Sequence, residues 1–254
     1  MGQFYNAKRT RNIFNPESKE PFQLSRSKID AFLKCPRCFY IDRRLGVGQP
    51  PSFPFNLNSA VDTLLKKEFD IHRLAKKTHP LMKAYGIDAI PFDGPRMDEW
   101  RDSLRRGIKY IYGPANLIIQ GGVDDVWINN KTGELIIVDY KSTSKEGEVS
   151  IDAEWQIAYK RQMEIYQWLF RKNGFHVQDI GYFVYCNGKT DRRAFDGKLE
   201  FDIQLLPYEG KMEWIEPTLN NIKQCLISDV LPFSSPECDF CAYRRAVSDV
   251  EENI

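Results

Sequence analysis

The sequence contains no uninterrupted apolar segment approaching the roughly 20 residues that a membrane-spanning helix needs. Its first residues lack the apolar core of a secretory signal, and Asn6 breaks the myristoylation pattern that Gly2 would otherwise begin. A phosphate-binding loop of the form G-x₄-G-K-[S/T] is also missing. These absences predict a cytoplasmic protein with no membrane partner and no helicase or polymerase motor of its own.

Net charge is nearly absent as well, because 36 basic and 35 acidic residues leave the chain at +1. Bulk charge therefore neither favours nor excludes an anionic partner, and any basic surface has to be local. Of the 254 residues, 42% are apolar and 13% aromatic, which is enough for a substantial core. We expect a folded chain that needs no disulfide cross-links.

Hydrophobic periodicity predicts a mixture of helices and strands. Helices are expected over 24–47 with a break at Pro36, and over 57–77, 97–112, 152–172 and 210–228. Strands are expected over 117–128, 134–141, 180–188 and 199–206. In the helix over 57–77, Ala60, Leu64 and Ile71 are expected to share the apolar face.

The segment GELIIVDYKS, residues 133–142, predicts a buried strand that ends in two opposite charges. Asp139 and Lys141 follow the apolar run LIIV at a spacing of two, which puts both side chains on one face of a strand. The preceding strand contains GGVDDV, and the linking NNKTG suits a tight reversal. A reversal centred between Lys131 and Thr132 pairs residues whose numbers sum to 263, so that Asp124 faces Asp139.

Two facing carboxylates repel each other unless a cation lies between them. Mg²⁺ or Mn²⁺ is the expected cation, because Mg²⁺ takes hard oxygen ligands and keeps waters and substrate phosphates in its shell. A divalent ion beside Lys141 would suit phosphodiester hydrolysis. Gly121 and Gly122 leave room for a backbone to approach. The plainer interpretation is a half-exposed hairpin with cross-strand ion pairs, and these residues alone leave both open.

The helix over 152–172 carries a stripe of side chains at helical spacing that is expected to face inward. The stripe consists of Trp155, Ala158, Tyr159, Gln162, Ile165, Tyr166 and Leu169. Gln162 is its polar exception, and a buried amide needs a hydrogen-bond partner. Gln162 and Tyr166, one turn apart, therefore either serve a polar site or pack as an ordinary core pair.

Taken in order, GGVDD, IIVDYKS and QMEIY resemble the G-x-x-D, D-x-K and Q-x-x-x-Y motifs of the PD-(D/E)XK nuclease superfamily, in its RecB-like and Cas4-like branch. LSRSKIDAFLKCPRCFYI is similar to the N-terminal helix of these nucleases, so the resemblance runs over about residues 24–245. We expect one α/β nuclease domain over 24–247, with a restriction-endonuclease-like mixed central sheet flanked by helices. A flexible arm is expected over 1–23 and a tail over 248–254.

The resemblance implies a role for each matched residue. Asp124 and Asp139 would bind the metal together with the backbone carbonyl of Tyr140, and Lys141 would orient the attacking water or stabilise the developing charge. Gln162 and Tyr166 would position the strand and the site. The family often carries His or Glu on the preceding helix, whereas NSAVD places Asp62 there. Asp62 is therefore either a replacement metal ligand or a solvated helix residue.

Four of the six cysteines form two C-x₂-C pairs, Cys35/Cys38 and Cys238/Cys241, near opposite ends of the chain. Each pair supplies two ligands, so a four-thiolate metal site requires the two segments to meet. In Cas4-like nucleases such cysteines hold a [4Fe-4S] cluster, with three of them in a C-x₂-C-x₅-C pattern whose last position here is Val247. The resemblance therefore favours a [4Fe-4S] cluster, with the extra cysteine of CPRC in place of the missing thiolate. Structural Zn²⁺ is the alternative, because the ligands themselves support it equally well.

The resemblance implies a DNA exonuclease that acts on single strands or ends, in DNA repair, recombination or CRISPR adaptation, with a helicase or adaptation protein as a possible partner. Local basic segments such as WRDSLRRGIKY could grip phosphates. A catalytically inactive nucleic-acid-binding module of the same fold and a site-specific endonuclease are the alternatives.

Overall fold

The computed structural model describes residues 9–50 and 56–253, and the chain divides into two compact units. The terminal unit combines Met1–Phe53, Ile111–Gln120 and Glu213–Ile254. The central unit combines Pro54–Tyr110 and Gly121–Met212. Of the arm expected over 1–23, residues 1–8 lie outside the described residues. The expected domain bounds at residues 24 and 247 stay predictions.

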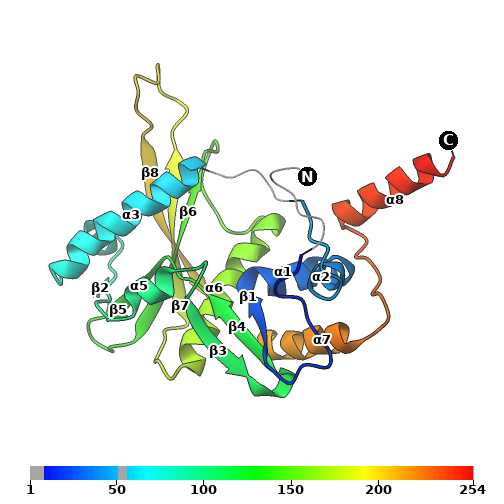
Figure 1. Cartoon of the computed structure of the whole chain (residues 1–254). Coiled ribbons are helices and arrows are strands. Elements are labelled where there is room, and N and C mark those ends of the chain that lie inside the picture. The colour runs from blue at the N-terminus through cyan, green and yellow to red at the C-terminus, as the bar shows by residue number, and fades with distance from the viewer. Residues whose placement is uncertain (1–8, 51–55, 254) are drawn as a thin grey trace. The chain divides into compact units, whose positions relative to one another are not determined.

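A five-stranded mixed sheet forms the centre of the central unit (Figure 1). Its order is β2 (Ala89–Pro91), β5 (Asp125–Asn129), β6 (Leu135–Thr143), β7 (Ile180–Gly188) and β8 (Phe201–Glu209). Strands β6 and β7 run parallel, whereas the other neighbours pair antiparallel. The mixed sheet flanked by helices is the predicted fold class.

The β5–β6 hairpin has the predicted register. Asp125 pairs with Val138 and Ile128 with Leu135, so the numbers of facing residues sum to 263. In the turn, the Asn129 side chain accepts hydrogen bonds from two backbone N–H groups. Gly133 has a φ of 71°, a left-handed conformation that glycine adopts without strain. The turn chemistry therefore fixes which residues face each other where the strands end.

Helices α3 (Asn56–Leu74) and α6 (Ile157–Lys172) lie on opposite faces of the sheet (Figure 1). On α3 the buried apolar residues are Leu65 and Phe69, which pack into a cluster with Trp127 of β5. The predicted apolar face of α3 is wrong, because all three of its residues, Ala60, Leu64 and Ile71, are exposed. Leu64 and Leu65 are adjacent and equally hydrophobic, so hydrophobicity alone does not determine which of the two faces the sheet.

Helix α6 is buried at every position from Gln162 to Phe170. Such a helix is covered on all sides instead of presenting one apolar stripe. The predicted stripe is wrong at Trp155, which is 64% exposed and belongs to η2 (Glu154–Gln156), a 3₁₀ turn before α6. Gln162 and Tyr166 are buried as expected.

The helix predicted over 97–112 ends early. Only α5 (Met97–Arg101) is helical, and β3 (Ile108–Tyr112) follows. Gly107 separates them with a φ of 66°, and a Cβ there would overlap the carbonyl of Gly121. The strand expected over 117–128 divides into β4 (Leu117–Gly121) and β5. Close backbone packing at these glycines overrides the helical periodicity.

The terminal unit contains α1 (Arg26–Lys34), α2 (Pro36–Arg43), α7 (Ile215–Ile227) and α8 (Asp239–Glu251). Pro36 is the first residue of α2, so the helix break predicted at this position is confirmed. Strand β1 (Phe22–Ser25) pairs in parallel with β4, in a sheet ordered β1-β4-β3.

The remaining short elements lie within the stretches between these helices and strands. They are α4 (Pro80–Ala84) and η1 (Gly113–Ala115). Residues 78–97, for which no element was predicted, thus contain α4 and the edge strand β2. Within the described part of the chain, every helix is too short or too polar to cross a membrane.

Candidate active site and cysteine centre

Asp139 and Lys141 lie at the end of β6, in the central unit, with their side chains in contact. The Lys141 ammonium forms an ion pair with Asp139 Oδ2. The side chain of Asp139 is fully buried, and that of Lys141 is 14% exposed. Burial lowers the pKa of Lys141, but the charges of Asp139 and Asp124 more than offset it, so the pKa is raised. Lys141 is therefore a stable ammonium at neutral pH.

Asp124 immediately precedes β5 and lies beside the end of β6. Its Oδ2 accepts a hydrogen bond of 2.8 Å from the backbone N–H of Tyr140. In a strand the N–H and C=O of one residue point toward the same edge, so the Tyr140 carbonyl is directed to the side of Asp124. The hairpin thus places Asp124 beside Tyr140, which follows Asp139, and the charges of both aspartates act on Lys141. Their role as metal ligands stays a prediction.

Gln162 and Tyr166 extend this group from α6. Lys141 Nζ donates to Gln162 Oε1 at 3.3 Å, and Gln162 Nε2 donates to the Tyr166 hydroxyl at 3.1 Å. The ammonium of Lys141 also lies 4.5 Å from the ring centre of Tyr159. The polar exception in the apolar helix is therefore satisfied by a chain of hydrogen bonds that leads to Lys141.

Below Asp124 lies a buried ion-pair network that the sequence did not indicate. Asp125 is fully buried and accepts hydrogen bonds from Arg73 at 2.5 Å, Arg101 at 3.0 Å and the Tyr140 hydroxyl at 2.9 Å. Burial and the Asp125 charge raise the pKa of Tyr140, which keeps its hydroxyl a donor. Arg101 Nε also donates to the backbone carbonyl of Asp124 at 3.1 Å.

This network holds Asp124 in place, because Arg101 contacts both the backbone carbonyl of Asp124 and the carboxylate of Asp125. Only one clue to it was present in the sequence. Arg73 follows Phe69 by one helical turn and therefore falls on the buried face of α3.

Asp62 lies on α3 and reaches the site through a neighbouring lysine. Its Oδ2 is 2.8 Å from Lys66 Nζ, which is also 3.7 Å from Asp124 Oδ1. The Asp62 side chain is 34% exposed, so it is neither buried nor fully solvated. The structure thus places Asp62 beside the site, with the Lys66 ammonium between it and Asp124.

The two glycines before Asp124 allow close approach, as predicted, but to different partners. A Cβ at Gly122 would come within 2.5 Å of the Ser103 backbone. A Cβ at Gly121 would overlap the ring of Tyr166. Gly122 therefore allows the Ser103 backbone to pack closely, and Gly121 allows close packing of the Tyr166 ring, whose hydroxyl accepts a hydrogen bond from Gln162.

The oxygen donors of Asp124, Asp139 and the Tyr140 carbonyl fit a divalent metal of the magnesium type. Mg²⁺ is bound in proteins through one or two carboxylates and retains open positions for water and phosphate. Thiolate and imidazole ligands, which select softer metals, are missing from this predicted set. The chemistry of the donors therefore fits Mg²⁺ or Mn²⁺.

The four paired cysteines meet in the terminal unit. Sγ–Sγ distances are 3.9 Å for Cys35–Cys241, 3.6 Å for Cys38–Cys238 and 3.4 Å for Cys38–Cys241, and all four sulfurs lie within 4.8 Å of one another. Burial raises the pKa of Cys35. Hydrogen bonds from the backbone of Cys38 and from other neighbours outweigh this effect and lower the pKa to about 7. Four converging thiol groups could hold one metal ion.

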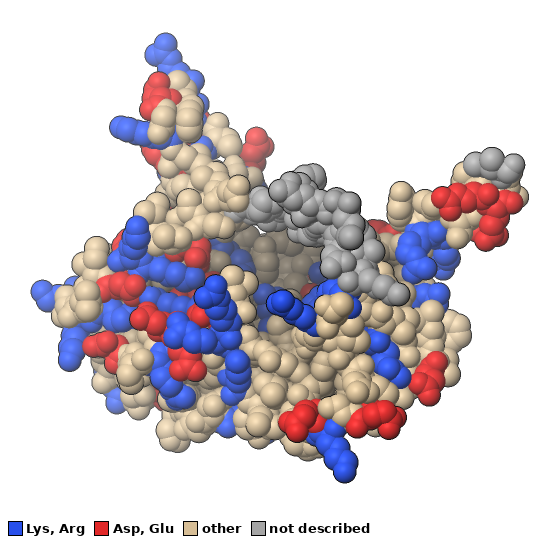
Figure 2. Space-filling model, in the orientation of Figure 1, with Lys and Arg blue, Asp and Glu red and all other residues tan. Residues whose placement is uncertain are grey.

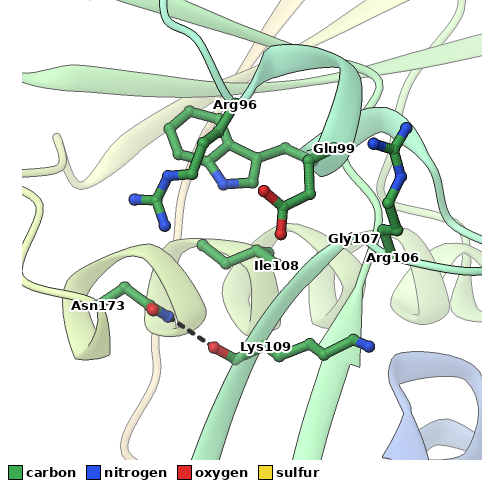
Figure 3. A pocket seen from close by; sticks show the side chains of 8 residues that line it. Arg96, Glu99, Arg106, Gly107, Ile108, Lys109 and Asn173 are labelled. Atoms are coloured by element: carbon green, nitrogen blue, oxygen red, sulfur yellow. Dashed lines mark hydrogen bonds between the residues drawn. The ribbon is translucent and has the colours of Figure 1, made fainter.

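Acidic and basic side chains are interspersed over α3 and α5 (Figure 2). A pocket of about 170 Å³ in the central unit is bordered by the basic side chains Arg96, Arg106 and Lys109 and by Glu99 (Figure 3). The Arg96 guanidinium lies 5.2 Å from the ring centre of Trp100. This pocket combines positive charge with a carboxylate, and it is lined by none of the predicted site residues.

Three comparisons with known proteins gave different results. No curated protein matches the sequence significantly. A solved structure titled "Crystal structure of SSO0001" is similar at 18% identity, with 83% of this chain and 78% of the other aligned. Its TM-score of 0.36 is too low to carry an argument. The family model of the PD-(D/E)XK nuclease superfamily matches residues 23–246, which include both metal-site candidates. The chain belongs to the PD-(D/E)XK nuclease superfamily.

Proposed function

We propose that this chain is a metal-dependent nuclease that hydrolyses phosphodiester bonds in DNA. The observation that carries the proposal is the buried Asp139–Lys141 ion pair at the end of β6, with Asp124 held beside it by the Tyr140 N–H. An ion pair buried only for stability would gain little over apolar residues of similar size. Membership of a nuclease superfamily supports the same reaction.

Asp124, Asp139 and the Tyr140 carbonyl would hold Mg²⁺ or Mn²⁺, with Asp62 as a further candidate ligand. When bound, the metal would supply Lewis-acid polarisation of the scissile phosphate and a more acidic water. The carboxylates of Asp124 and Asp139 would lose their mutual repulsion in the same step.

Lys141 would donate hydrogen bonds to the phosphate or the attacking water. The charges of Asp139 and Asp124 raise the pKa of Lys141 in the metal-free protein, which favours the ammonium form that donates hydrogen bonds. The developing negative charge on the phosphate would be stabilised by this ammonium. Gln162 and Tyr166 would hold Lys141 in place through the hydrogen-bond chain from α6.

The finer assignment rests on the RecB-like and Cas4-like resemblance of the motifs. It makes the enzyme an exonuclease on single strands or DNA ends, in DNA repair, recombination or CRISPR adaptation. Aromatic and basic side chains together suit single strands, because bases stack while phosphates pair with cations. A helicase or adaptation protein would be the partner.

Cleavage of end-labelled single-stranded DNA with Mg²⁺ or Mn²⁺ tests this function, with Asp139→Ala and Lys141→Ala as variants. We expect metal-dependent cleavage that disappears in both variants while DNA binding by Lys141→Ala persists. DNA binding by the wild type without cleavage under either metal would instead identify a binding module. Closed circular DNA separates the remaining alternatives, because an exonuclease spares it and an endonuclease cuts it.

We propose further that Cys35, Cys38, Cys238 and Cys241 bind one metal centre. The resemblance favours a [4Fe-4S] cluster, whereas the ligands equally suit zinc. Four sulfurs around one zinc ion lie about 3.8 Å apart, because each Zn–S bond is about 2.3 Å and the geometry is tetrahedral. A cluster needs a wider cage, since each thiolate binds a different iron. The observed spacing, within 4.8 Å, therefore supports zinc.

Metal analysis after anaerobic purification distinguishes the two centres. We expect one zinc per chain and no visible absorption, whereas four irons per chain with a brown colour would identify the cluster. Cys225→Ser is the matched control, because Cys225 is a half-buried cysteine outside the group of four. Cys238→Ser should lose the metal and Cys225→Ser should retain it.

A further inference from the structure

Lys66 lies between two carboxylates of the candidate active site. Its Nζ is 2.8 Å from Asp62 Oδ2, one turn earlier on α3, and 3.7 Å from Asp124 Oδ1, at the start of β5. The second contact joins α3 to the β5–β6 hairpin. The Lys66 side chain is 25% exposed, so it is partly shielded from solvent. One ammonium thus bridges Asp62 and Asp124.

Both carboxylate oxygens of Asp124 are therefore engaged. Oδ2 accepts the Tyr140 N–H at 2.8 Å, and Oδ1 faces Lys66. A carboxylate oxygen has more than one lone pair, so the hydrogen bond from Tyr140 leaves room for a metal. The Lys66 ammonium instead weakens metal binding at Asp124, because two cations repel each other strongly where solvent screening is weak.

We propose that Lys66 is a built-in competitor of the divalent cation at Asp124. It neutralises the Asp62–Asp124 pair before the metal binds, and it has to move away from Asp124 when the metal arrives. Lys66 is thus a positioning residue that acts through the carboxylates. The inference rests on the function proposed above, because it concerns the same site. According to this inference, Lys66 lowers the affinity of the DNA-free enzyme for the divalent cation.

Calorimetric titration of the whole protein with Mn²⁺, without DNA, tests this inference. We expect Lys66→Met to bind Mn²⁺ roughly five- to tenfold more tightly than wild type, because a competing charge is removed. Lys66→Arg keeps the charge and should stay close to wild type. Lys67→Met is the matched control, since it removes the same charge from the next, exposed position of α3. An equal or weaker Mn²⁺ affinity in Lys66→Met would overturn the inference.

The outcome is separable from the fate of the proposed function. If wild type cleaves DNA, Asp139→Ala does not, and Lys66→Met binds Mn²⁺ as wild type does, the nuclease stands and the competitor role is wrong. If neither wild type nor Lys66→Met binds Mn²⁺ and nothing cleaves, both proposals fail. Lys66→Gln, which retains a polar side chain next to Asp62, replaces Lys66→Met if thermal unfolding shows that the latter does not fold.

Discussion

The backbone N–H of Tyr140 donates a 2.8 Å hydrogen bond to the carboxylate of Asp124. The same tyrosine donates its hydroxyl to Asp125 at 2.9 Å, so one residue holds two consecutive aspartates, one through its backbone and one through its side chain. The alternation of a strand makes this possible, because backbone groups lie in the sheet plane while side chains leave it. The carboxylate of Asp124 therefore lies at the candidate active site, whereas that of Asp125 is buried in the ion-pair network with Arg73 and Arg101.

Tyr140→Phe separates these two contacts. It removes the hydroxyl from fully buried Asp125 but leaves the N–H bond to Asp124 in place. We expect the free energy of unfolding to fall by about 1–3 kcal/mol, because a buried acceptor loses a partner. Urea unfolding measures the loss. Tyr182→Phe, at a half-buried tyrosine on β7, should change stability less, and an equal loss in both variants would contradict the role of the Asp125 contact.

Gly121→Ala tests the close approach of Tyr166. The added Cβ would overlap the ring, so the tyrosine has to shift and its hydrogen bond with Gln162 is disturbed. We expect cleavage to slow by up to about 100-fold, since small displacements at a reacting centre are costly. Gly113→Ala is the control, because a Cβ there meets no neighbouring atom within 4 Å. Unchanged cleavage by Gly121→Ala would show that Tyr166 does not position the site.

Removal of the metal proposed to bind the four cysteines is expected to destabilise the terminal unit. Metal binding to four thiolates contributes directly to folding, on the order of several kcal/mol at neutral pH. Cys238→Ser should therefore lower the melting temperature in a scanning calorimeter, and a zinc chelator should lower that of wild type but not that of the variant. A chelator effect of equal size on both proteins would argue against this site.

Protonation of Asp70 is expected to lower the stability of the protein in acid. Burial raises its pKa, but hydrogen bonds and charges from Arg73 and Arg101 outweigh this, so the pKa is lowered. A lowered pKa in the folded state stabilises the protein above the unfolded value of about 3.9, and this contribution is lost as the pH falls through the folded pKa.

Asp70→Asn checks the pH dependence through urea unfolding between about pH 7 and pH 3. Wild type should be the more stable protein at neutral pH, and the difference should shrink below about pH 4. A constant difference across this range would show that ionisation of Asp70 does not stabilise the fold.

The sequence predicted the β5–β6 hairpin well because its information is local. Asn129 to Gly133 determine the turn, the turn determines the register, and the register places Asp124 beside Tyr140, which follows Asp139. The break at Pro36 and the strand over 180–188 are likewise local signals. The meeting of the two cysteine pairs was inferred from ligand number, and the structure agrees.

What the sequence did not predict depends on contacts between distant segments. The phase of α3 is set by Trp127 and its neighbours, so Leu64 was assigned to the wrong face. The network around Asp125 joins residues from four elements, and no spacing rule links Arg73 to Arg101. The contact between Lys66 and Asp124 likewise joins α3 to the start of the hairpin, and no local pattern predicts it.

The positions of the four cysteines in the chain also bear on the order in which the two units can fold during synthesis. The chain leaves the ribosome from its N-terminus at a pace slow enough for folding to start early. Every residue of the central unit, up to Met212, is synthesised before Cys238 and Cys241. The Asp124–Asp139 site can therefore assemble while Cys35 and Cys38 still wait for their partners. If the four cysteines bind one metal as proposed, its binding would join Cys35 to Cys241, which are 206 residues apart in the chain.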